Sequence, residues 1–366
     1  MQPVRRGRAL AVAAISAVLA STGAAAASSA AGSTPSAQGS FTEHHFHSAD
    51  GDRDYWVFDP AHSQRSGRPM VVFLHGCNET ATETAQASHF NDLAAERGFV
   101  VVYPQQNVTS GSSAPLADGN GIGCWNWFLP QDQDRGSGEP AIIAGITQLV
   151  AKQLRIDPQR IYVEGVSAGA DMAVTLGATY PDVFAAVGAI AGCAYRTCSD
   201  ATGELTYDAM GPNARVVPMF IENGTADTLN NMGMAGGLLT SWLGADDLAD
   251  DGVMNNSVSR QPASTTNYGF DQTPQPLSGD ACIHNNTLTC PGGVVGFQQT
   301  YPYTVTTYDD SAGCDVLEFW AIHFMEHAHP DAPGDGPYSD PLGPDVTAAS
   351  YDFFSTHSLG ERGCSR

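Results

Sequence analysis

Short, mainly apolar runs recur along this chain, and longer segments with helical spacing of apolar residues separate them. Continuous apolar runs indicate strands that are buried on both faces, as in a parallel sheet. The runs lie at residues 70–74, 99–103, 161–164, 185–190 and 216–221. The helical segments lie at residues 82–97, 139–156, 168–178, 238–248 and 346–358. Strands that alternate with helices predict an α/β fold, with a mostly parallel sheet and helices on both faces.

Two further pairs of segments show a period of two. Residues 41–47 and 53–59 flank the turn Asp50-Gly51-Asp52 and predict an antiparallel hairpin. Residues 303–308 and 316–322 are expected to pair in the same way. The segments 105–138 and 223–299 are largely irregular.

The chain shows no internal repeat and no break in composition after residue 40, so we expect residues 41–366 to form a single domain. Residues 1–27 combine early arginines, an apolar stretch and A-x-A sites, which is typical of a secretory signal peptide. The apolar stretch is too short to span a bilayer. Residues 28–40 predict a disordered leader. We therefore expect a secreted, extracellular protein, with the choice between the Sec and twin-arginine routes left open.

The chain is strongly acidic, with a formal net charge of −23 and a single lysine, Lys152. Such a surface repels phosphate backbones and anionic lipid, so we expect neither a nucleic-acid nor a membrane partner. The charge suits a monomeric protein acting on a neutral substrate. His44, His45 and His47 lack a partner at ligand spacing, so we expect an exposed strand edge there and no metal site.

Eight cysteines follow residue 76, and an even number in an exported chain predicts disulfides. Cys193 and Cys198 are close enough in sequence to close a small loop, as are Cys282 and Cys290. Roughly a hundred pairings are possible, so spacing leaves the connectivity open. The other four cysteines are Cys77, Cys124, Cys314 and Cys364.

A nucleophile motif lies between the strand at 161–164 and the helix that follows it. Gly165-Val-Ser167-Ala-Gly169 has the form of the nucleophile elbow, a sharp strand-to-helix turn. The serine needs neighbours that are nearly free of side chains, and the helix N-terminus directs N–H groups at the reacting carbonyl. Ser167 is therefore the predicted nucleophile.

A serine nucleophile needs a base and an acid, which follow it in the order acid, then histidine. His327 and His329 lie in the loop after the strand 316–322. We choose His327, because Pro330 restricts the backbone of His329. Asp227 lies in the loop after the strand 216–221 and is the predicted acid.

The oxyanion hole needs two backbone donors. One is the N–H of Ala168, the residue after the nucleophile. The other is expected from the turn His75-Gly76-Cys77 that follows the strand 70–74, and we assign it to the N–H of Cys77. His75 is expected to support this turn by hydrogen bonds.

The chain resembles the secreted poly(3-hydroxybutyrate) depolymerase and feruloyl esterase family. This resemblance implies the α/β-hydrolase fold, and a Ser-Asp-His triad at Ser167, Asp227 and His327. It also implies a disulfide between Cys77 and Cys124, which would hold the segment Trp125–Phe128 beside the site. The matching segments are Leu74-His-Gly-Cys-Asn-Glu-Thr80, Cys124-Trp-Asn-Trp-Phe128, Gly136-Ser-Gly-Glu-Pro140, Asp157-Pro-Gln-Arg-Ile-Tyr-Val163, Gly165-Val-Ser-Ala-Gly-Ala-Asp-Met-Ala173, Tyr180-Pro-Asp-Val-Phe-Ala-Ala186, Gly224-Thr-Ala-Asp227 and His327-Ala-His-Pro330.

Departures from the family pattern concern the substrate more than the triad. The family usually has glycines where this chain has Phe324, Met325 and Glu326, and often tryptophan where it has His329. Trp125, Trp127 and His329 are the predicted substrate-binding residues. Core packing is the alternative for each tryptophan.

These features predict a serine esterase that needs no cofactor and no metal. The expected substrate is an aliphatic poly(3-hydroxyalkanoate) polyester or its oligomers. The alternatives are feruloyl or acetyl xylan esters of plant cell walls, β-diketones of oxidised polyvinyl alcohol, and a secreted binding protein without catalysis.

Overall fold

The computed structural model describes residues 38–61, 66–109, 119–270, 283–284, 287–288, 300–330 and 338–360, which belong to one compact unit. The predicted signal peptide (residues 1–27) and nearly all of the predicted leader lie outside the described residues. So do the side chains of Cys282, Cys290 and Cys364.

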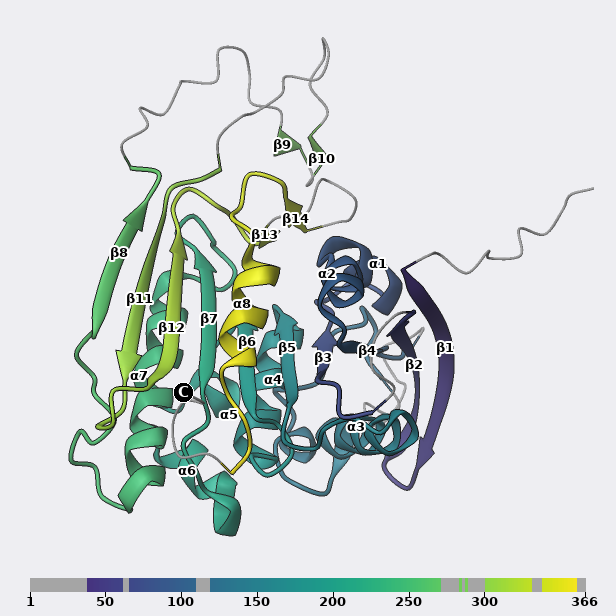
Figure 1. Cartoon of the computed structure of the whole chain (residues 1–366), viewed down its shortest axis with the longest axis horizontal. Helices are drawn as coiled ribbons and strands as arrows, with labels where there is room; N and C mark the ends of the chain where they lie inside the picture. Colours follow the sequence, from purple (N-terminus) through teal and green to yellow (C-terminus); the bar gives the residue numbers. More distant parts are fainter. Residues whose placement is uncertain are drawn as a thin grey trace, which may run out of the picture. The chain divides into compact units, whose positions relative to one another are not determined.

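Within the described residues, ten strands form one sheet in the order β1-β2-β4-β3-β5-β6-β7-β12-β11-β8 (Figure 1). The six strands from β4 to β12 are mutually parallel, and the outer strands are antiparallel to their neighbours. The sheet strands are β1 (Gly39–Ser48), β2 (Gly51–Pro60), β3 (Met70–Leu74), β4 (Val100–Pro104), β5 (Ile161–Val166), β6 (Ala186–Ile190), β7 (Met219–Gly224), β8 (Ser264–Tyr268), β11 (Tyr303–Asp309) and β12 (Asp315–Ile322). Two short pairs lie apart from this sheet: β9 (Ile283–His284) with β10 (Thr287–Leu288), and β13 (His329–Pro330) with β14 (Ser339–Asp340).

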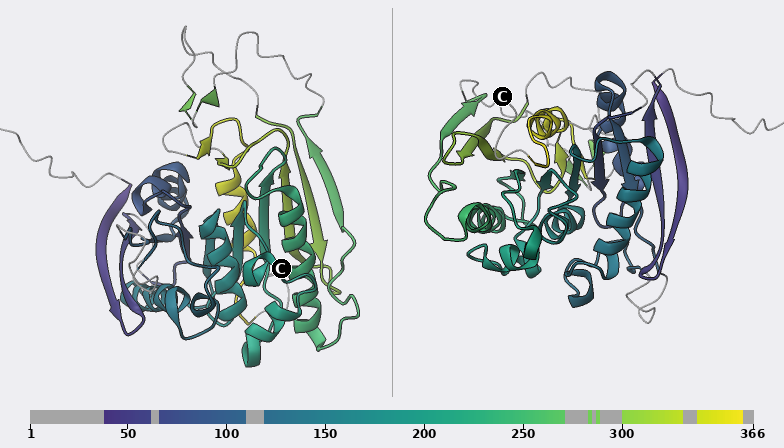
Figure 2. Two further views of the ribbon diagram at one scale, coloured as in Figure 1. Left: turned by 180° about the vertical axis from the view of Figure 1, so that it is seen from behind. Right: turned by 60° about the horizontal axis from the view of Figure 1, so that its bottom comes forward.

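Helices cover both faces of the sheet (Figure 2). Alternate strand residues point to opposite faces, so Val163 packs with Ile143 on one face and Tyr162 packs with Phe354 on the other. The first face carries α3 (Gly138–Leu154), α4 (Ala168–Thr179) and α7 (Met232–Asp251), and the second carries α1 (Ala81–Ala87), α2 (Phe90–Arg97) and α8 (Val346–Ser355). The predicted α/β class and both predicted antiparallel pairs are confirmed.

Two features differ from the sequence-based prediction. The sequence predicted one helix at residues 82–97, and the structure has two, α1 and α2. His89 lies between them in a left-handed backbone conformation, with φ +52°, which interrupts the helix. Several elements were indicated by no periodicity. The 3₁₀ turn Pro130–Asp132 and β8 lie in the segments predicted to be irregular, and α5 (Tyr195–Cys198), α6 (Glu204–Met210) and the 3₁₀ turn Gly211–Asn213 lie between the strands predicted at 185–190 and 216–221.

The edge strand β1 carries the three histidines that follow one another closely in sequence. His45 lies opposite Asp54 of β2, with 2.7 Å between Nδ1 and the carboxylate, and both side chains are exposed. The predicted exposed strand edge is confirmed. In the part of the chain that the structure describes, no group of three or more His, Cys, Asp or Glu residues could hold a metal ion. No helix among the described residues is both long and apolar enough to cross a bilayer.

The parallel strands bring the candidate chemistry to one edge of the sheet. Val166 at the end of β5 lies beside Ile190 of β6, and Ile322 at the end of β12 lies beside Gly224 of β7. In open α/β sheets, ligands bind outside the carboxyl ends of the strands. The loops that follow β3, β5, β7 and β12 therefore meet at this edge and form the candidate ligand-binding region.

Candidate active site

Ser167 occupies the tight turn between β5 and α4. Its backbone has φ +57° and ψ −123°, a conformation that non-glycine residues rarely adopt and that tends to mark functional sites. The flanking glycines are required by space: a Cβ on Gly169 would lie 2.2 Å from the carbonyl oxygen of Leu74, and one on Gly165 would lie 2.5 Å from the backbone of Gly169. The N–H of Ser167 donates to the carbonyl of Ile190 at 2.9 Å, which ties the turn to β6. The structure thus has the elbow geometry expected from the sequence.

His327 and Asp227 form a hydrogen-bonded pair in the loops after β12 and β7. The distance between His327 Nδ1 and Asp227 Oδ2 is 2.7 Å, and the carboxylate is fully buried. Its other oxygen accepts the N–H groups of Leu229 at 2.8 Å and Asn230 at 2.9 Å. With its Nδ1 proton held by the carboxylate, the imidazole keeps Nε2 available to accept a proton.

Backbone hydrogen bonds hold these two loops together. Thr225 N–H donates to Ile322 at 2.8 Å, and Ala226 N–H donates to Met325 at 2.9 Å. Gly224 allows this close approach, because a Cβ there would lie 2.3 Å from the Met325 carbonyl oxygen. The position of the Asp227–His327 pair therefore follows from contacts between loops that are about a hundred residues apart in sequence.

The turn after β3 lies against the nucleophile elbow. A Cβ built on Gly76 would be 3.5 Å from the Cβ of Ser167, so the two backbones are in close contact. The Gly76 N–H donates to Glu79 Oε2 at 2.7 Å, and the Asn78 N–H donates to the carbonyl of Ile122 at 2.8 Å. Within the described residues, the N–H of Cys77 between them is paired with no acceptor. It is thus available for the role that the sequence analysis gave it.

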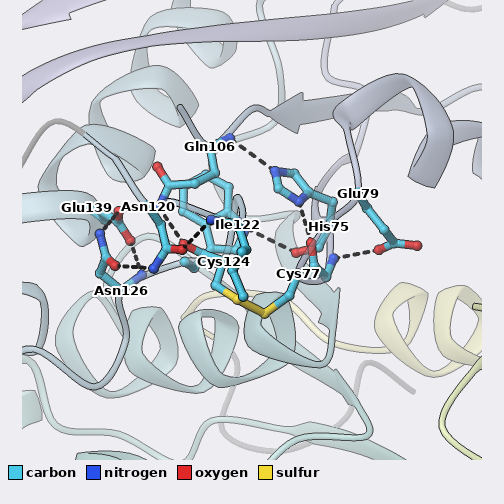
Figure 3. Close-up of a disulfide and its surroundings, with 11 residues drawn as sticks. His75, Cys77, Glu79, Gln106, Asn120, Ile122, Cys124, Asn126 and Glu139 are labelled. Atoms are coloured by element: carbon cyan, nitrogen blue, oxygen red, sulfur yellow. Dashed lines mark hydrogen bonds between the residues drawn. A yellow bond between two sulfur atoms is a disulfide. The ribbon is translucent and has the colours of Figure 1, made fainter. Parts of the chain in front are cut away.

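The imidazole of His75 supports this turn through hydrogen bonds (Figure 3). Its Nε2 accepts the N–H of Gln106 at 3.0 Å, which places the ring proton on Nδ1, 2.8 Å from the carbonyl oxygen of Gly76. Complete burial lowers the pKa of His75 to about 4, so the ring is neutral. Trp125 packs on this imidazole and donates its Nε1–H to the His75 carbonyl at 3.1 Å. The supporting role expected for His75 agrees with these hydrogen bonds.

A disulfide joins this turn to the following segment, with the pairing that the resemblance implied. Cys77 and Cys124 are bonded with a Cα–Cα distance of 4.1 Å, and Figure 3 shows the bond between the two loops. The segment after Cys124 is also held by the buried Glu139 of α3, whose Oε2 accepts the N–H of Asn126 at 2.6 Å. A second disulfide joins Cys193 and Cys198, and Cys314 is also disulfide-bonded. The predicted partner side chains Cys282, Cys290 and Cys364 lie outside the described residues.

Two of the three predicted substrate-binding residues have buried side chains. Trp125 is fully buried, and the imidazole of His329 is buried 5.8 Å from the ring of Phe73. Burial also lowers the pKa of His329 to about 4. Both side chains pack in the interior, as the core-packing alternative for Trp125 expected, and a substrate-binding role for either stays a prediction. Trp127 is half-buried against the exposed Phe128 and stays a candidate.

Sequence reasoning did not single out Leu229, and it named Phe324 only as a departure from the family pattern. Leu229 and Phe324 are about two-thirds exposed, at 64% and 62%, and each lies within three residues of the Asp227–His327 pair. Glu222 of β7 is completely buried, and its pKa is raised well above the usual range by burial and by the negative charges of Asp227 and Glu164. An acidic residue in an apolar strand is a visible signal. Nothing in the sequence distinguishes the exposed Leu229 from a core leucine.

The chain is similar to known esterases and depolymerases. A model of the family "Esterase PHB depolymerase" matches residues 53–248. Poly(3-hydroxyalkanoate) depolymerase C of Paucimonas lemoignei is 33% identical over 269 residues, which are 73% of this chain and 56% of the relative. A poly(3-hydroxybutyrate) depolymerase of Ralstonia pickettii is 28% identical, over 76% of this chain and 52% of the relative. The chain thus spans about half the length of these depolymerases.

The probable acetylxylan esterase A of Aspergillus fumigatus is 31% identical, over 39% of this chain and 36% of its own length. A solved acetyl xylan esterase from Aspergillus awamori covers 78% of this chain and 94% of its own, with a TM-score of 0.55 and 19% identity. The likeness to that structure shows the fold, which is the α/β-hydrolase fold that the resemblance implied. Because the family model matches more than half of the residues, the chain belongs to the esterase PHB depolymerase family.

Proposed function

We propose that this protein is a serine esterase with Ser167 as nucleophile, His327 as base and Asp227 as the acid that orients it. The observation that carries the proposal is the buried Asp227–His327 hydrogen bond at the same sheet edge as the strained Ser167 elbow. Strain and a buried, fully bonded carboxylate have a cost, and an active site is where such features concentrate.

The mechanism follows from these positions. The hydroxyl oxygen of Ser167 attacks the ester carbonyl while His327 Nε2 takes the hydroxyl proton. The oxyanion is stabilised by the N–H groups of Ala168 and Cys77. The imidazolium, held by Asp227, then gives its proton to the leaving alcohol, and water hydrolyses the acyl-enzyme by the same steps.

The proposed substrate is a poly(3-hydroxyalkanoate) or its oligomers. Support comes from the two depolymerase relatives, which match about three quarters of this chain. The exposed side chains of Leu229 and Phe324 provide uncharged, apolar surface beside the acid and the base, which suits an aliphatic polyester. An acetyl or feruloyl ester of a plant cell wall is the second candidate, supported by the acetylxylan esterase relative.

A panel of four substrates distinguishes these functions: p-nitrophenyl butyrate, a polyhydroxybutyrate suspension, methyl ferulate and acetylated xylan. We expect turnover of the first two and little of the last two, with Ser167→Ala as the inactive control. Release of acetate from xylan at a higher kcat/KM than hydrolysis of the butyrate would favour the second candidate. Failure on all four would count against the esterase proposal.

We also propose that the protein works outside the cytoplasm, as a monomer. The signal-like residues 1–27 support export, and disulfides such as Cys193–Cys198 persist in oxidising compartments. Mass spectrometry of the protein from culture medium, with size-exclusion chromatography, would test both points. A cell-retained product with an intact N-terminus would contradict export, and a dimer mass would contradict the monomer.

A further inference from the structure

Glu79 is a buried carboxyl group that the proposed mechanism does not use. Its side chain turns back on the loop after β3, where Oε2 accepts the Gly76 N–H at 2.7 Å (Figure 3). We propose that Glu79 is a positioning residue that fixes the backbone of Gly76 and thereby directs the N–H of Cys77 at the oxyanion. This inference rests on the proposed esterase function.

The geometry of one peptide unit carries the argument. The carbonyl of Gly76 and the N–H of Cys77 belong to the same planar trans peptide, so they point in opposite directions. His75 Nδ1–H holds that carbonyl at 2.8 Å, so the Cys77 N–H points away from His75 within the same peptide plane. The orientation of this peptide then depends on the two backbone torsions of Gly76.

Gly76 has more conformational freedom than any other residue type would have at that position. A Cβ on Gly76 would lie 2.9 Å from Glu79 Oε2, so a side chain here would displace the glutamate oxygen from the Gly76 N–H. Glu79 fixes the N–H side of this residue while His75 fixes its carbonyl side. Without the glutamate acceptor, one end of the glycine is free to rotate and the oxyanion donor loses its direction.

Burying a carboxyl group at this position costs free energy, because the charged form loses its hydration. Burial raises the pKa of Glu79 to about 7, and within the described residues no basic side chain forms an ion pair with it. A purely structural site would be filled at lower cost by an apolar side chain. A carboxyl group at this position is explained if its oxygen is needed to accept the Gly76 N–H.

The test uses three substitutions at Glu79 that separate the acceptor from the charge. Glu79→Gln keeps a carbonyl oxygen at the same distance along the side chain and removes the charge. Glu79→Asp keeps the charge and withdraws the oxygen by one methylene. Glu79→Met removes the acceptor and keeps the volume. Glu164→Met, at another fully buried carboxyl that bonds Ser350 and not the oxyanion turn, is the matched control.

On p-nitrophenyl butyrate, we expect kcat of Glu79→Gln to stay within about threefold of the wild type. Glu79→Met and Glu79→Asp should lose roughly 10²-fold in kcat, with KM within about threefold, because the lost interaction acts on the transition state. Glu164→Met should leave kcat within about threefold, whatever its effect on the melting temperature. Kinetics are measured well below each variant's melting temperature.

Two results would overturn the inference. One is an unchanged kcat in Glu79→Asp, and the other is an equal loss of kcat in Glu79→Gln and Glu79→Asp. Should Glu79→Met fail to fold, the Gln and Asp variants alone decide the matter. The inference fails separately from the esterase proposal, since Ser167→Ala tests the latter and is indifferent to Glu79.

Discussion

Removal of the Cys77–Cys124 disulfide by the double substitution Cys77→Ala/Cys124→Ala should lower both stability and turnover. The bond spans 47 residues of sequence. In the chain-entropy model, a loop of this length contributes about 4 kcal/mol to the free energy of unfolding. With an unfolding entropy of roughly 2 cal/mol/K per residue, the roughly 325 residues of the predicted domain 41–366 would convert that value into a fall of about 6 °C in melting temperature.

The expected loss of turnover follows from the position of Cys77. Its N–H is the proposed oxyanion donor, and removing such a donor costs roughly 10²–10³-fold in kcat. After loss of the bond, Glu79 and His75 still hold Gly76. We therefore expect kcat to fall by about 10–100-fold and KM to change by less than about threefold.

Calorimetry and kinetics on p-nitrophenyl butyrate measure the two effects, and peptide mapping of the unreduced protein checks the bond itself. The double variant Cys193→Ala/Cys198→Ala is a stability comparison, because its loop of 5 residues contributes only about 2 kcal/mol. A larger melting shift in this second variant would refute the loop-length argument. An unchanged kcat in a destabilised Cys77→Ala/Cys124→Ala protein would refute the link to the oxyanion donor.

Four further outcomes are expected. Ser167→Ala should lower kcat by roughly 10⁴-fold or more with the melting temperature preserved, and a variant that keeps a tenth of the activity would exclude the assignment. His327→Ala should approach that loss, whereas the buried His329→Ala should mainly lower the melting temperature, so an inactive His329→Ala beside an active His327→Ala would reverse the choice of base. Burial raises the pKa of Glu164 from 4.5 to about 8, so its contribution to stability is fully present below pH 4.5 and is lost as pH rises towards 8, by up to about 4–5 kcal/mol. Glu164→Gln should therefore make the free energy of unfolding less dependent on pH between 4.5 and 8, and the same pH dependence in variant and wild type would contradict this. Phe324→Ser should slow hydrolysis of a polyhydroxybutyrate suspension and spare p-nitrophenyl butyrate, and equal effects on both would argue against a surface role.

The elements that the sequence predicted correctly are those with a strong local signal. Continuous apolar runs such as residues 70–74 mark strands because burial on both faces excludes polar residues, and the elbow around Ser167 is specified by adjacent glycines. The break in the helix at residues 82–97 was not predictable in this way. It depends on the left-handed backbone of His89, a residue type that does not by itself signal a helix end.

Burial was the main feature of the site that the sequence could not supply. Trp125 and His329 are residue types that often contact substrate, but Trp125 is packed on His75 and His329 lies beside Phe73. Both contacts join segments far apart in the chain, so no local pattern reports them. Glu79 illustrates the same limit over a short range, since the sequence shows a glutamate three residues after a glycine and not the direction of its side chain.

The departures from the family pattern before His327 leave the acid–base pair intact for a physical reason. The loop is held through backbone atoms, namely the carbonyl of Met325 and the N–H of Phe324, which bonds Thr225 Oγ1 at 3.0 Å. Any residue except proline supplies those atoms. Phe324 nevertheless has φ +71°, a conformation that a glycine adopts without strain and a phenylalanine does not. Its ring is 62% exposed and lies 6.4 Å from the ring of His323, so little burial offsets that cost, and the Phe324→Ser variant tests whether the ring serves binding of the polymer.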